Sequence, residues 1–416
     1  MMKQHPKNVT INGRDYHWPQ WPVVVICCDG SEPEYMERAM REGLMPNLKR
    51  VIAKGENKRG LSAMPSFTNP NNMSIATGRR PEVHGIGGNY LIDPATGQET
   101  MMNDPKWLLA PTIFAEFQKA GAKVTVVTAK DKLRLLLGNG LKFDGSAICF
   151  SSEKADKATL QDNGITDLLT FVGKPLPEVY SADLSEFVFA AGVKLLKRDR
   201  PELMYLSTTD YVQHKFAPGS EGANSFYKMM DGYVGALDDL GCVLIIVADH
   251  GMKDKHKADG SPDVLYLQDA MDAKFGAGKS KVILPITDPY VVHHGALGSF
   301  AQIYLYGPSA ADATAFIKSQ DGIDRVLTKA EAVKTYGLYA DRCGDLIVIS
   351  GGPQHSKVIG TSASKHDLSG LDAPLRSHGG LSEQEIPFIS NHHLKNLPQP
   401  LNNWDAFFVG CNCVEA

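Results

Sequence analysis

The sequence predicts an α/β protein with a largely parallel sheet, interrupted by an inserted α+β subdomain. Short β-branched runs alternate with amphipathic stretches, which is typical of βα units. Between about residues 252 and 370 the pattern changes to short strand-like and helix-like segments separated by many Gly and Pro. Polar motifs flank this stretch on both sides, so we expect it to fold over a site that the surrounding core builds.

The predicted elements follow from short apolar runs and from apolar residues at helical spacing. The predicted strands are Val23 to Cys28, Lys123 to Thr128, Leu203 to Ser207, Val243 to Ala248 and Asp345 to Ser350. The predicted helices are Glu34 to Glu42, Met45 to Lys54, Thr112 to Ala120, Leu184 to Lys197 and Asn224 to Leu240. Pro46 supports the start of the second helix, because proline is favoured at early helical positions.

The insertion contains its own strand and helix signals. Its predicted strands are VLYLQ, AQIYLY and LIVIS, and its predicted helices are ADATAFIKSQ and KAEAVKTYG. We therefore predict a core formed by residues 1–251 and 371–416, and a cap formed by residues 252–370. In an open parallel sheet the site between them lies beyond the carboxyl ends of the strands.

Composition narrows the class of protein. The chain has 416 residues, with 43 Lys+Arg against 47 Asp+Glu and 43% hydrophobic residues. The length and the hydrophobic fraction are enough to form a sizeable core. The near balance of acidic and basic residues does not indicate a basic surface that would bind nucleic acid. The longest apolar runs fall short of the roughly 18 residues of a membrane span, so no membrane partner is expected. The first twenty residues are polar and lack a signal-peptide core, which favours the cytoplasm.

Seven cysteines are scattered at positions 27, 28, 149, 242, 343, 411 and 413. An odd number at these spacings fits neither a disulfide framework nor a zinc-ribbon site. Cys27 and Cys28 lie inside an apolar run, so we expect them to be buried core residues.

Two segments bring an acid to the end of a predicted strand. In VVVICCDG, Asp29 closes a buried run and Gly30 lets the chain turn. In YLSTTDYVQH, Asp210 and His214 are four residues apart, which places them on one face of a helix. Taken singly, these residues also fit a turn and a solvated helix face.

Two further segments supply histidines. VLIIVADHGM runs from a strand straight into Asp249, His250 and Gly251. Neighbouring strand side chains point to opposite faces, so both reach one site only if the chain bends, and Gly251 permits that bend. LRSHGGLSEQEIPFI places His378 before two glycines, where a solvent-exposed loop histidine is the ordinary alternative.

Together these segments offer three carboxylates and three imidazoles, a donor set that suits Zn²⁺, Mn²⁺ or Fe²⁺. We predict two divalent metal ions. Each ion would have three protein ligands and an open position, which is typical of catalytic sites. The two predicted ligand sets are Asp210, His214 and His378, and Asp29, Asp249 and His250.

The segment PSFTNPN supplies a hydroxyl, Thr68. Two roles are compatible here: Thr68 as the N-cap of a helix over Asn71 to Thr77, and Thr68 as a nucleophile that also ligates the ion of Asp29, Asp249 and His250. A helix N-terminus offers amide donors to a phosphoryl group, while a metal lowers the pKa of the hydroxyl.

Lys130 and Lys132, in TAKDKLR, follow the predicted strand Lys123 to Thr128 onto the same edge. The ordinary alternative is a solvated basic turn. Two ammonium groups beside a dimetal site indicate a substrate with a second anionic group, such as a carboxylate.

The order of these motifs, with TGRRPEVHGIGGN between PSFTNPN and YLSTTDYVQH, resembles the alkaline phosphatase superfamily and its nucleotide pyrophosphatase/phosphodiesterase-like branch. The resemblance covers residues 29 to 378. It implies an α/β/α core, two zinc ions at the six ligand positions above and a covalent phospho-threonine at Thr68. It also implies that Asn89 hydrogen-bonds a phosphoryl oxygen.

Within this branch the chain most resembles enzymes that split the carbon–phosphorus bond of phosphonoacetate into acetate and phosphate. The expected partner is then a small-molecule phosphonate, with no nucleic acid; a homodimer stays open. The sequence lacks the Cys-x-Pro-x-Arg motif of sulfatases, and we locate no arginine clamp of an alkaline phosphatase.

Two alternatives remain open. A phosphodiesterase acting on nucleotides would require aromatic residues that stack on a base rather than paired lysines. A non-catalytic metal-binding scaffold would not need Thr68. His293 and His294, in VVHHGALG, are a rival metal pair, for which we expect a structural or cap role.

Overall fold

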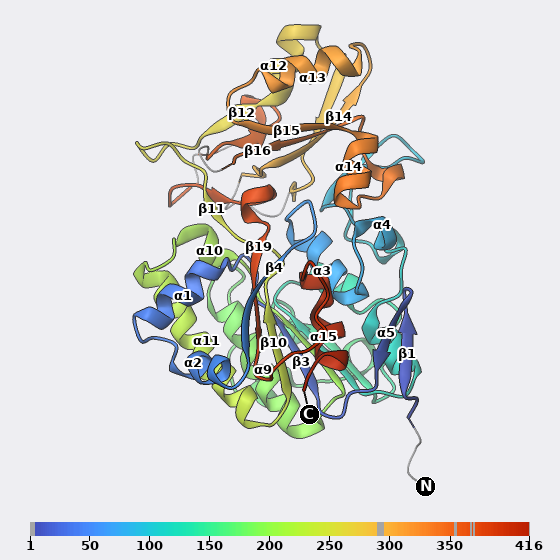
Figure 1. Ribbon diagram of the computed structural model, residues 1–416, viewed down its shortest axis with the longest axis vertical. Helices are drawn as coiled ribbons and strands as arrows, with labels where there is room; N and C mark the ends of the chain where they lie inside the picture. The colour runs from blue at the N-terminus through green and yellow to red at the C-terminus, as the bar shows by residue number, and fades with distance from the viewer. Residues whose placement is uncertain (1–4, 289–294, 353–355, 367, 369–370, 416) are drawn as a thin grey trace.

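The computed structural model describes residues 5–288, 295–352, 356–366, 368 and 371–415. In Figure 1 a larger layered core lies below a smaller part that carries α12, α13 and α14. His293 and His294 lie outside the described residues.

A seven-stranded sheet runs through the core in the order β4-β19-β10-β3-β9-β7-β8. The five strands from β10 to β8 are parallel, and β19 runs antiparallel to both of its neighbours. The five parallel strands are buried throughout, because helices cover both faces of the sheet. Their bounds are β3 Val23–Cys27, β7 Val124–Thr128, β8 Ala147–Ser151, β9 Leu203–Ser207 and β10 Val243–Val247; the others are β4 Glu56–Leu61 and β19 Glu385–Ser390.

Two hydrophobic clusters occupy the two faces of this sheet. Along β3, Val24 and Ile26 belong to the first cluster, whereas Val23, Val25 and Cys27 belong to the second, as the alternation of strand side chains requires. The first is covered by α1 Pro33–Arg41, α2 Pro46–Ala53, α9 Asp183–Asp199 and α11 Glu221–Asp239. The second is covered by α3 Thr68–Thr77, α5 Ile113–Lys119, α6 Asp131–Leu137 and α15 Ala406–Asn412. The fold is therefore the expected α/β/α sandwich.

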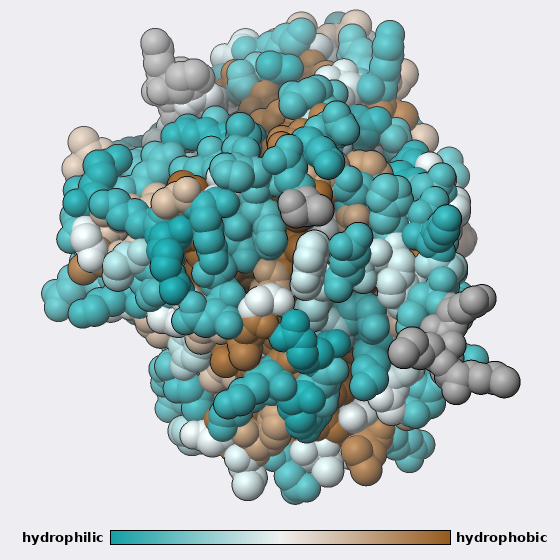
Figure 2. Space-filling view, turned by 60° about the horizontal axis from the view of Figure 1, so that its bottom comes forward, coloured by the Kyte–Doolittle hydropathy of each residue, from teal (hydrophilic) through white to brown (hydrophobic). Residues whose placement is uncertain are grey.

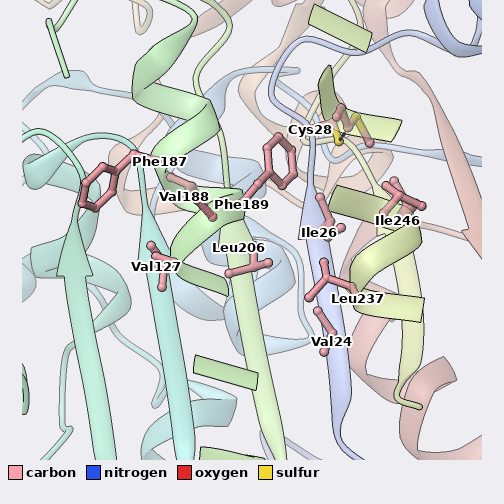
Figure 3. Packing of buried hydrophobic residues seen from close by; sticks show 14 of the residues in the cluster. Val24, Ile26, Cys28, Val127, Phe187, Val188, Phe189, Leu206, Leu237 and Ile246 are labelled. Carbon is pink, nitrogen blue, oxygen red and sulfur yellow. Dashed lines mark hydrogen bonds between the residues drawn. The ribbon is translucent and has the colours of Figure 1, made fainter. Parts of the chain in front are cut away.

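Figure 3 shows part of the first cluster. Val24 and Ile26 of β3, Leu206 of β9 and Val127 of β7 pack on the same face as Phe189 of α9. This continuous apolar layer fixes the positions of the neighbouring strands, and therefore the relative positions of their carboxyl ends.

Smaller elements surround the sandwich. They are β1 Asn8–Ile11, β2 Arg14–His17, α4 Pro81–His84, β5 Tyr90–Ile92, β6 Glu99–Met101, α7 Leu160–Asn163, α8 Leu168–Val172 and α10 Tyr211–Lys215.

A four-stranded antiparallel sheet, β13-β14-β16-β15, organises the upper part of the chain and has its own hydrophobic cluster. Its strand β16 is the predicted strand Asp345 to Ser350, which belongs to this sheet and not to the parallel one. The elements here are β12 Val264–Tyr266, α12 Leu267–Phe275, β13 Ser280–Ile283, β14 Phe300–Leu305, α13 Ala310–Lys318, β15 Ile323–Thr328, α14 Lys329–Tyr336, β16 Leu346–Ser350 and β17 Val358–Gly360.

The chain enters and leaves this upper part side by side, because β11 Lys253–Asp254 pairs antiparallel with β18 Arg376–Ser377. The upper cluster also includes Met64 and Phe67 from the core, just before Thr68. The division at residues 252 and 370 stays a prediction.

The cysteines and the surface agree with the composition. All seven cysteines are free, and Cys27 and Cys28 are buried as expected. Figure 2 shows a face on which hydrophilic side chains predominate and hydrophobic ones occur in smaller groups between them. Among the described residues, no helix has the length and apolar character needed to cross a bilayer.

Candidate active site

Four neighbouring strands end level with one another at one edge of the core sheet. Cys27 of β3 is paired in register with Val247 of β10 and with Ser207 of β9, and Ser207 is paired with Thr128 of β7. The residues that follow these ends therefore converge. They include Asp29 after β3, Asp249 and His250 after β10, Asp210 after β9 and Lys130 after β7.

Asp29, Asp249 and His250 form the first acid–histidine group. All three are buried. His250 Nε2 lies 3.4 Å from Asp29 Oδ1 and 3.7 Å from Asp249 Oδ2. The bend predicted after β10 is present, and the Gly251 amide donates to the Glu383 carbonyl at 2.7 Å.

Asp210, His214 and His378 form the second group. His214 Nε2 lies 2.9 Å from Asp210 Oδ2, and His378 Nε2 lies 3.7 Å from the same oxygen. Asp210 occupies the N-cap position of the short helix α10 and His214 lies one turn later, where its amide donates to the Asp210 carbonyl at 2.9 Å. The rings of His378 and His250 stack at 3.7 Å, so the two groups adjoin.

The three histidines are oriented alike by backbone carbonyls. Nδ1 of His214 donates to Arg376 at 2.7 Å, Nδ1 of His250 to Gly251 at 2.9 Å and Nδ1 of His378 to Ser66 at 2.9 Å. Because a carbonyl only accepts, Nδ1 is the donor in each ring, and Nε2 is the nitrogen that faces the carboxylates. This is the arrangement that protein ligands to divalent metals commonly use.

The donor atoms fit two divalent cations. Within each group they lie within 4.8 Å of one another. Asp29 Oδ1 is buried and has no hydrogen-bond partner among the described residues. Carboxylate oxygens and imidazole nitrogens without thiolates suit borderline and hard divalent ions.

The electrostatics of these groups also favour a cation. Burial raises the pKa of Asp29 well above its ordinary value, and the nearby carboxylates of Asp210 and Asp249 raise it further. Burial also raises the pKa of Asp249. Burial and the neighbouring histidines hold the pKa of His378 well below its usual range. Several acids gathered away from water are mutually destabilising unless positive charge is supplied.

Thr68 is the first residue of α3, and Phe67 occupies the N-cap position without a side-chain capping bond. The expected helix over Asn71 to Thr77 thus begins three residues earlier, and the N-cap role for Thr68 is wrong. The Thr68 hydroxyl instead lies 3.2 Å from His250 Nε2, beside the first group.

Asn72, one turn after Thr68, was not singled out by the sequence. Its amide nitrogen donates to the Thr68 carbonyl at 3.0 Å and to Asp249 Oδ2 at 3.1 Å. Its oxygen accepts from Tyr205 at 2.7 Å and from Ser207 at 2.9 Å. With all four of these bonds made, the amide has one orientation and fixes Asp249 relative to α3.

A cavity beside the two groups brings the remaining predicted residues together. It is lined by Thr68, Asn89, Lys130, Lys132, Asp29, Asp210 and His378. The Asn89 side chain donates to the Ile286 carbonyl at 3.3 Å. Lys130 Nζ donates to the Val179 carbonyl at 3.3 Å and lies over the Tyr180 ring.

The two lysines differ in their surroundings. Burial lowers the pKa of Lys130, although the carboxylates of Glu153, Asp210, Asp288 and Asp29 oppose this shift. Lys132 Nζ contacts both oxygens of Asp288, at 2.8 and 3.0 Å. Asp288 and Tyr180 also line the cavity, and no short motif in the sequence had pointed to them.

Comparison with known families gives a match over most of the chain. Residues 23–357 match the family described as type I phosphodiesterase / nucleotide pyrophosphatase. An uncharacterised pyrophosphatase/phosphodiesterase of Schizosaccharomyces pombe is 26% identical over 244 residues, which cover 56% of this chain and 45% of that protein. Human ectonucleotide pyrophosphatase/phosphodiesterase family member 1 is 27% identical over 255 residues, which cover 56% of this chain and 24% of that protein. The match thus spans less than half the length of these curated relatives.

Solved structures give a fuller match. A crystal structure of phosphonoacetate hydrolase from Sinorhizobium meliloti in complex with phosphonoacetate has 57% sequence identity and a TM-score of 0.94, covering 98% of this chain and 99% of that chain. The same enzyme in complex with phosphonoformate matches equally well. Human ectonucleotide pyrophosphatase/phosphodiesterase 5, at 18% identity and a TM-score of 0.63 over 94% of each chain, shows the same fold.

Proposed function

The chain belongs to the type I phosphodiesterase / nucleotide pyrophosphatase family, and we propose that it hydrolyses the carbon–phosphorus bond of phosphonoacetate to acetate and phosphate. The observation that carries the proposal is one cavity that joins both acid–histidine groups, Thr68 and two lysines. The 57% identity to a phosphonoacetate hydrolase over nearly the full length of both chains supports it.

The proposed cofactors are two divalent ions, with Zn²⁺ as the expected metal. Asp29, Asp249 and His250 would hold one, with Thr68 beside it, and Asp210, His214 and His378 the other. When bound, the ions supply positive charge that lowers the pKa of the Thr68 hydroxyl and offsets the charge of the phosphonate oxygens.

Thr68 is the proposed nucleophile. Its deprotonated Oγ1 attacks phosphorus, a new O–P bond forms, and the C–P bond breaks with its electron pair moving to carbon. Protonation of that carbon gives acetate. Water then cleaves the phospho-threonine, which releases phosphate and restores the hydroxyl. Thr68 lies in the first turn of α3, and we propose that backbone amides of that turn donate to the phosphoryl group.

The lysines are proposed to stabilise the departing group. The carbanion is tolerable only because charge flows into the adjacent carboxylate, which carries more negative charge in the transition state. Lys130 and Lys132 line the cavity and supply cations for that carboxylate. Asn89, on the same cavity, is proposed to donate to a phosphoryl oxygen. Cations that bind the transition state more strongly than the ground state raise the rate.

A cross comparison of substrates tests the function. Phosphate release from phosphonoacetate is compared with nitrophenol release from a nitrophenyl ester, for the unmodified protein, Lys130→Ala and Lys132→Ala. We expect each substitution to lower kcat and raise KM on phosphonoacetate, by about 2–4 kcal/mol in transition-state stabilisation if the charge is desolvated. The ester should be hydrolysed poorly and be little affected. Equal losses on both substrates would assign the lysines to the fold.

A nucleotide phosphodiesterase activity is the second candidate, favoured by the family match. It would hydrolyse bis-nitrophenyl phosphate or a dinucleotide faster than phosphonoacetate. Location in the cytoplasm remains a prediction. The homodimer also remains a prediction, and light scattering would measure the oligomeric state.

A further inference from the structure

Lys255 and Glu383 form an ion pair that is almost completely removed from water. Lys255 Nζ lies 2.8 Å from Glu383 Oε1, and the two side chains are 1% and 0% exposed. Burying two charges costs desolvation energy that their attraction does not reliably offset, so such a pair is weak evidence of stabilisation. Its other contacts therefore decide what it does.

Glu383 binds two turns of the chain at once. Its backbone carbonyl accepts from the Gly251 amide at 2.7 Å. Its side-chain Oε2 accepts from the Gly380 amide at 2.9 Å, and Oε1 accepts from Ser382 as well as from Lys255. Both carboxylate oxygens are thus engaged, and the side chain has a fixed direction.

The two turns held by Glu383 are those that carry His250 and His378. Gly251 directly follows His250, and Gly380 follows His378 by two residues. The Gly380 carbonyl in turn accepts from Ser66 Oγ at 2.7 Å, and the Ser66 carbonyl accepts from His378 Nδ1. The stacked rings of His250 and His378 belong to different acid–histidine groups, so one residue connects both groups.

Lys255 belongs to the segment by which the chain enters the upper part of the molecule. It follows β11 directly, and its amide donates to the Leu375 carbonyl at 2.8 Å, beside β18. Its ammonium group fixes the Glu383 carboxylate where the upper part of the molecule joins the core.

We infer that Glu383, through its bonds to the turns after His250 and His378, is a positioning residue that sets the relative places of these two histidines, and thereby the affinity of both metal sites. The inference rests on the proposed function, in which these histidines are ligands. Groups that orient metal ligands typically contribute 10–100-fold in metal affinity.

Two matched double variants separate positioning from the ion pair itself. Lys255→Met with Glu383→Gln removes both charges but keeps a side-chain oxygen for the Gly380 amide. Lys255→Met with Glu383→Leu removes both charges and that oxygen, and fills the space with apolar side chains of similar volume. Neither leaves an uncompensated buried charge, so both are expected to fold. As a control, Lys54→Met with Asp238→Asn removes an ion pair with an N–O distance of 2.7 Å, which lies before the start of β10, whereas His250 follows the end of that strand.

Zn²⁺ affinity is measured by competition with a chromophoric chelator, and hydrogen exchange is measured on the metal-free proteins. We expect the glutamine variant and the control to stay within about threefold of the unmodified affinity. The leucine variant should lose 10–100-fold and exchange faster in the segment 376–384. Equal affinity and equal exchange in the two double variants would overturn the inference.

The two failures are distinguishable. If the unmodified protein binds two ions and hydrolyses phosphonoacetate but the leucine variant matches it, only the positioning role fails. If the unmodified protein binds no Zn²⁺, the proposed function and the inference fail together. If the leucine variant does not fold, Lys255→Met with Glu383→Met takes its place, because methionine is unbranched like glutamine but offers no oxygen to the Gly380 amide. A 10–100-fold lower affinity than that of the glutamine variant would support the positioning role, and equal affinities would contradict it.

Discussion

At the scale of single residues, hydrogen bonds to the backbone and to Asn72 orient the side chains of the candidate active site. Each site histidine gives Nδ1 to a backbone carbonyl, so its remaining nitrogen is aimed by the fold and not by a chance rotamer. Asn72 does the same for Asp249. Such partners make a ligand set rigid before a cation arrives, which reduces the entropy lost on binding.

Replacing Thr68 tests the nucleophile. Thr68→Ala should lower turnover of phosphonoacetate by several orders of magnitude, because no other hydroxyl group is proposed to attack. Thr68→Ser keeps a hydroxyl and should retain part of the activity. Metal content and circular dichroism should match the unmodified protein, since the Thr68 side chain caps nothing. Near-normal turnover in Thr68→Ala would indicate direct attack by water.

The sequence predicted the acids, histidines and Thr68 because each follows a recognisable strand end or motif. It could not predict Asn72, Asp288 or Glu383 as site residues. Their roles depend on partners far away in the chain, such as Asp249 for Asn72 and Lys132 for Asp288. Helical spacing from Thr68 was the one available signal for Asn72.

At the scale of elements, four of the five parallel strands were predictable, whereas the fifth, β8, was missed although it is buried, as were β4 and β19. The strands β3, β7, β9 and β10 are continuous apolar runs, and their bounds agree with expectation to within a residue. The missed strand β4, ENKRGL, is polar because it lies at the sheet edge, and β19 contains Pro387. The helix α3 begins earlier than expected, because it is buried almost throughout and carries no amphipathic signal.

The turn after His378 depends on a glycine. Gly379 has φ +114, and a Cβ there would lie 2.3 Å from the Phe67 ring, which packs against His378. Gly379→Ala should therefore destabilise the protein beyond the roughly 1–3 kcal/mol of backbone strain. It should also lower metal affinity, because Phe67 precedes Thr68.

Gly121→Ala is the matched control for this prediction. Gly121 has φ +104, and a Cβ there would meet nothing within 4 Å. It should show the backbone strain alone, with unchanged metal content. Equal melting temperatures and metal affinities for the two alanine variants would mean that Phe67 gives way freely.

At the scale of the whole molecule, the buried ion pair makes stability depend on pH. Burial raises the pKa of Glu383, but the Lys255 ammonium and the hydrogen bonds to the carboxylate outweigh burial, so the net shift is downward. A lowered pKa stabilises the folded state above the unfolded value of about 4.3, and this contribution is lost as the pH falls through the folded pKa.

Urea unfolding of the metal-free protein between about pH 3 and pH 7 measures this effect. The free energy of unfolding of the unmodified protein, minus that of Lys255→Met with Glu383→Gln, should shrink as the pH falls below about 4.3. A difference that is constant with pH would mean that the Glu383 pKa is the same in the folded and unfolded states.

The upper and lower parts of the molecule meet at the cavity. Substrate binding should therefore change hydrogen exchange in both parts. Lys132 of the core pairs with Asp288, Asn89 donates to Ile286, and Phe67 packs edge-on against Phe300. A substrate carboxylate that binds Lys132 must share that ammonium with Asp288, so binding alters the contact between the parts. We expect phosphonoacetate to slow hydrogen exchange both in the core turns that carry the acids and in residues 282–288 and 300–305.

Asp288→Asn should weaken the protection of residues 282–288 by substrate while leaving the protection of the core turns unchanged. Protection confined to the core turns would contradict the cap role predicted for residues 252–370, and would favour an oligomer contact for that part of the chain.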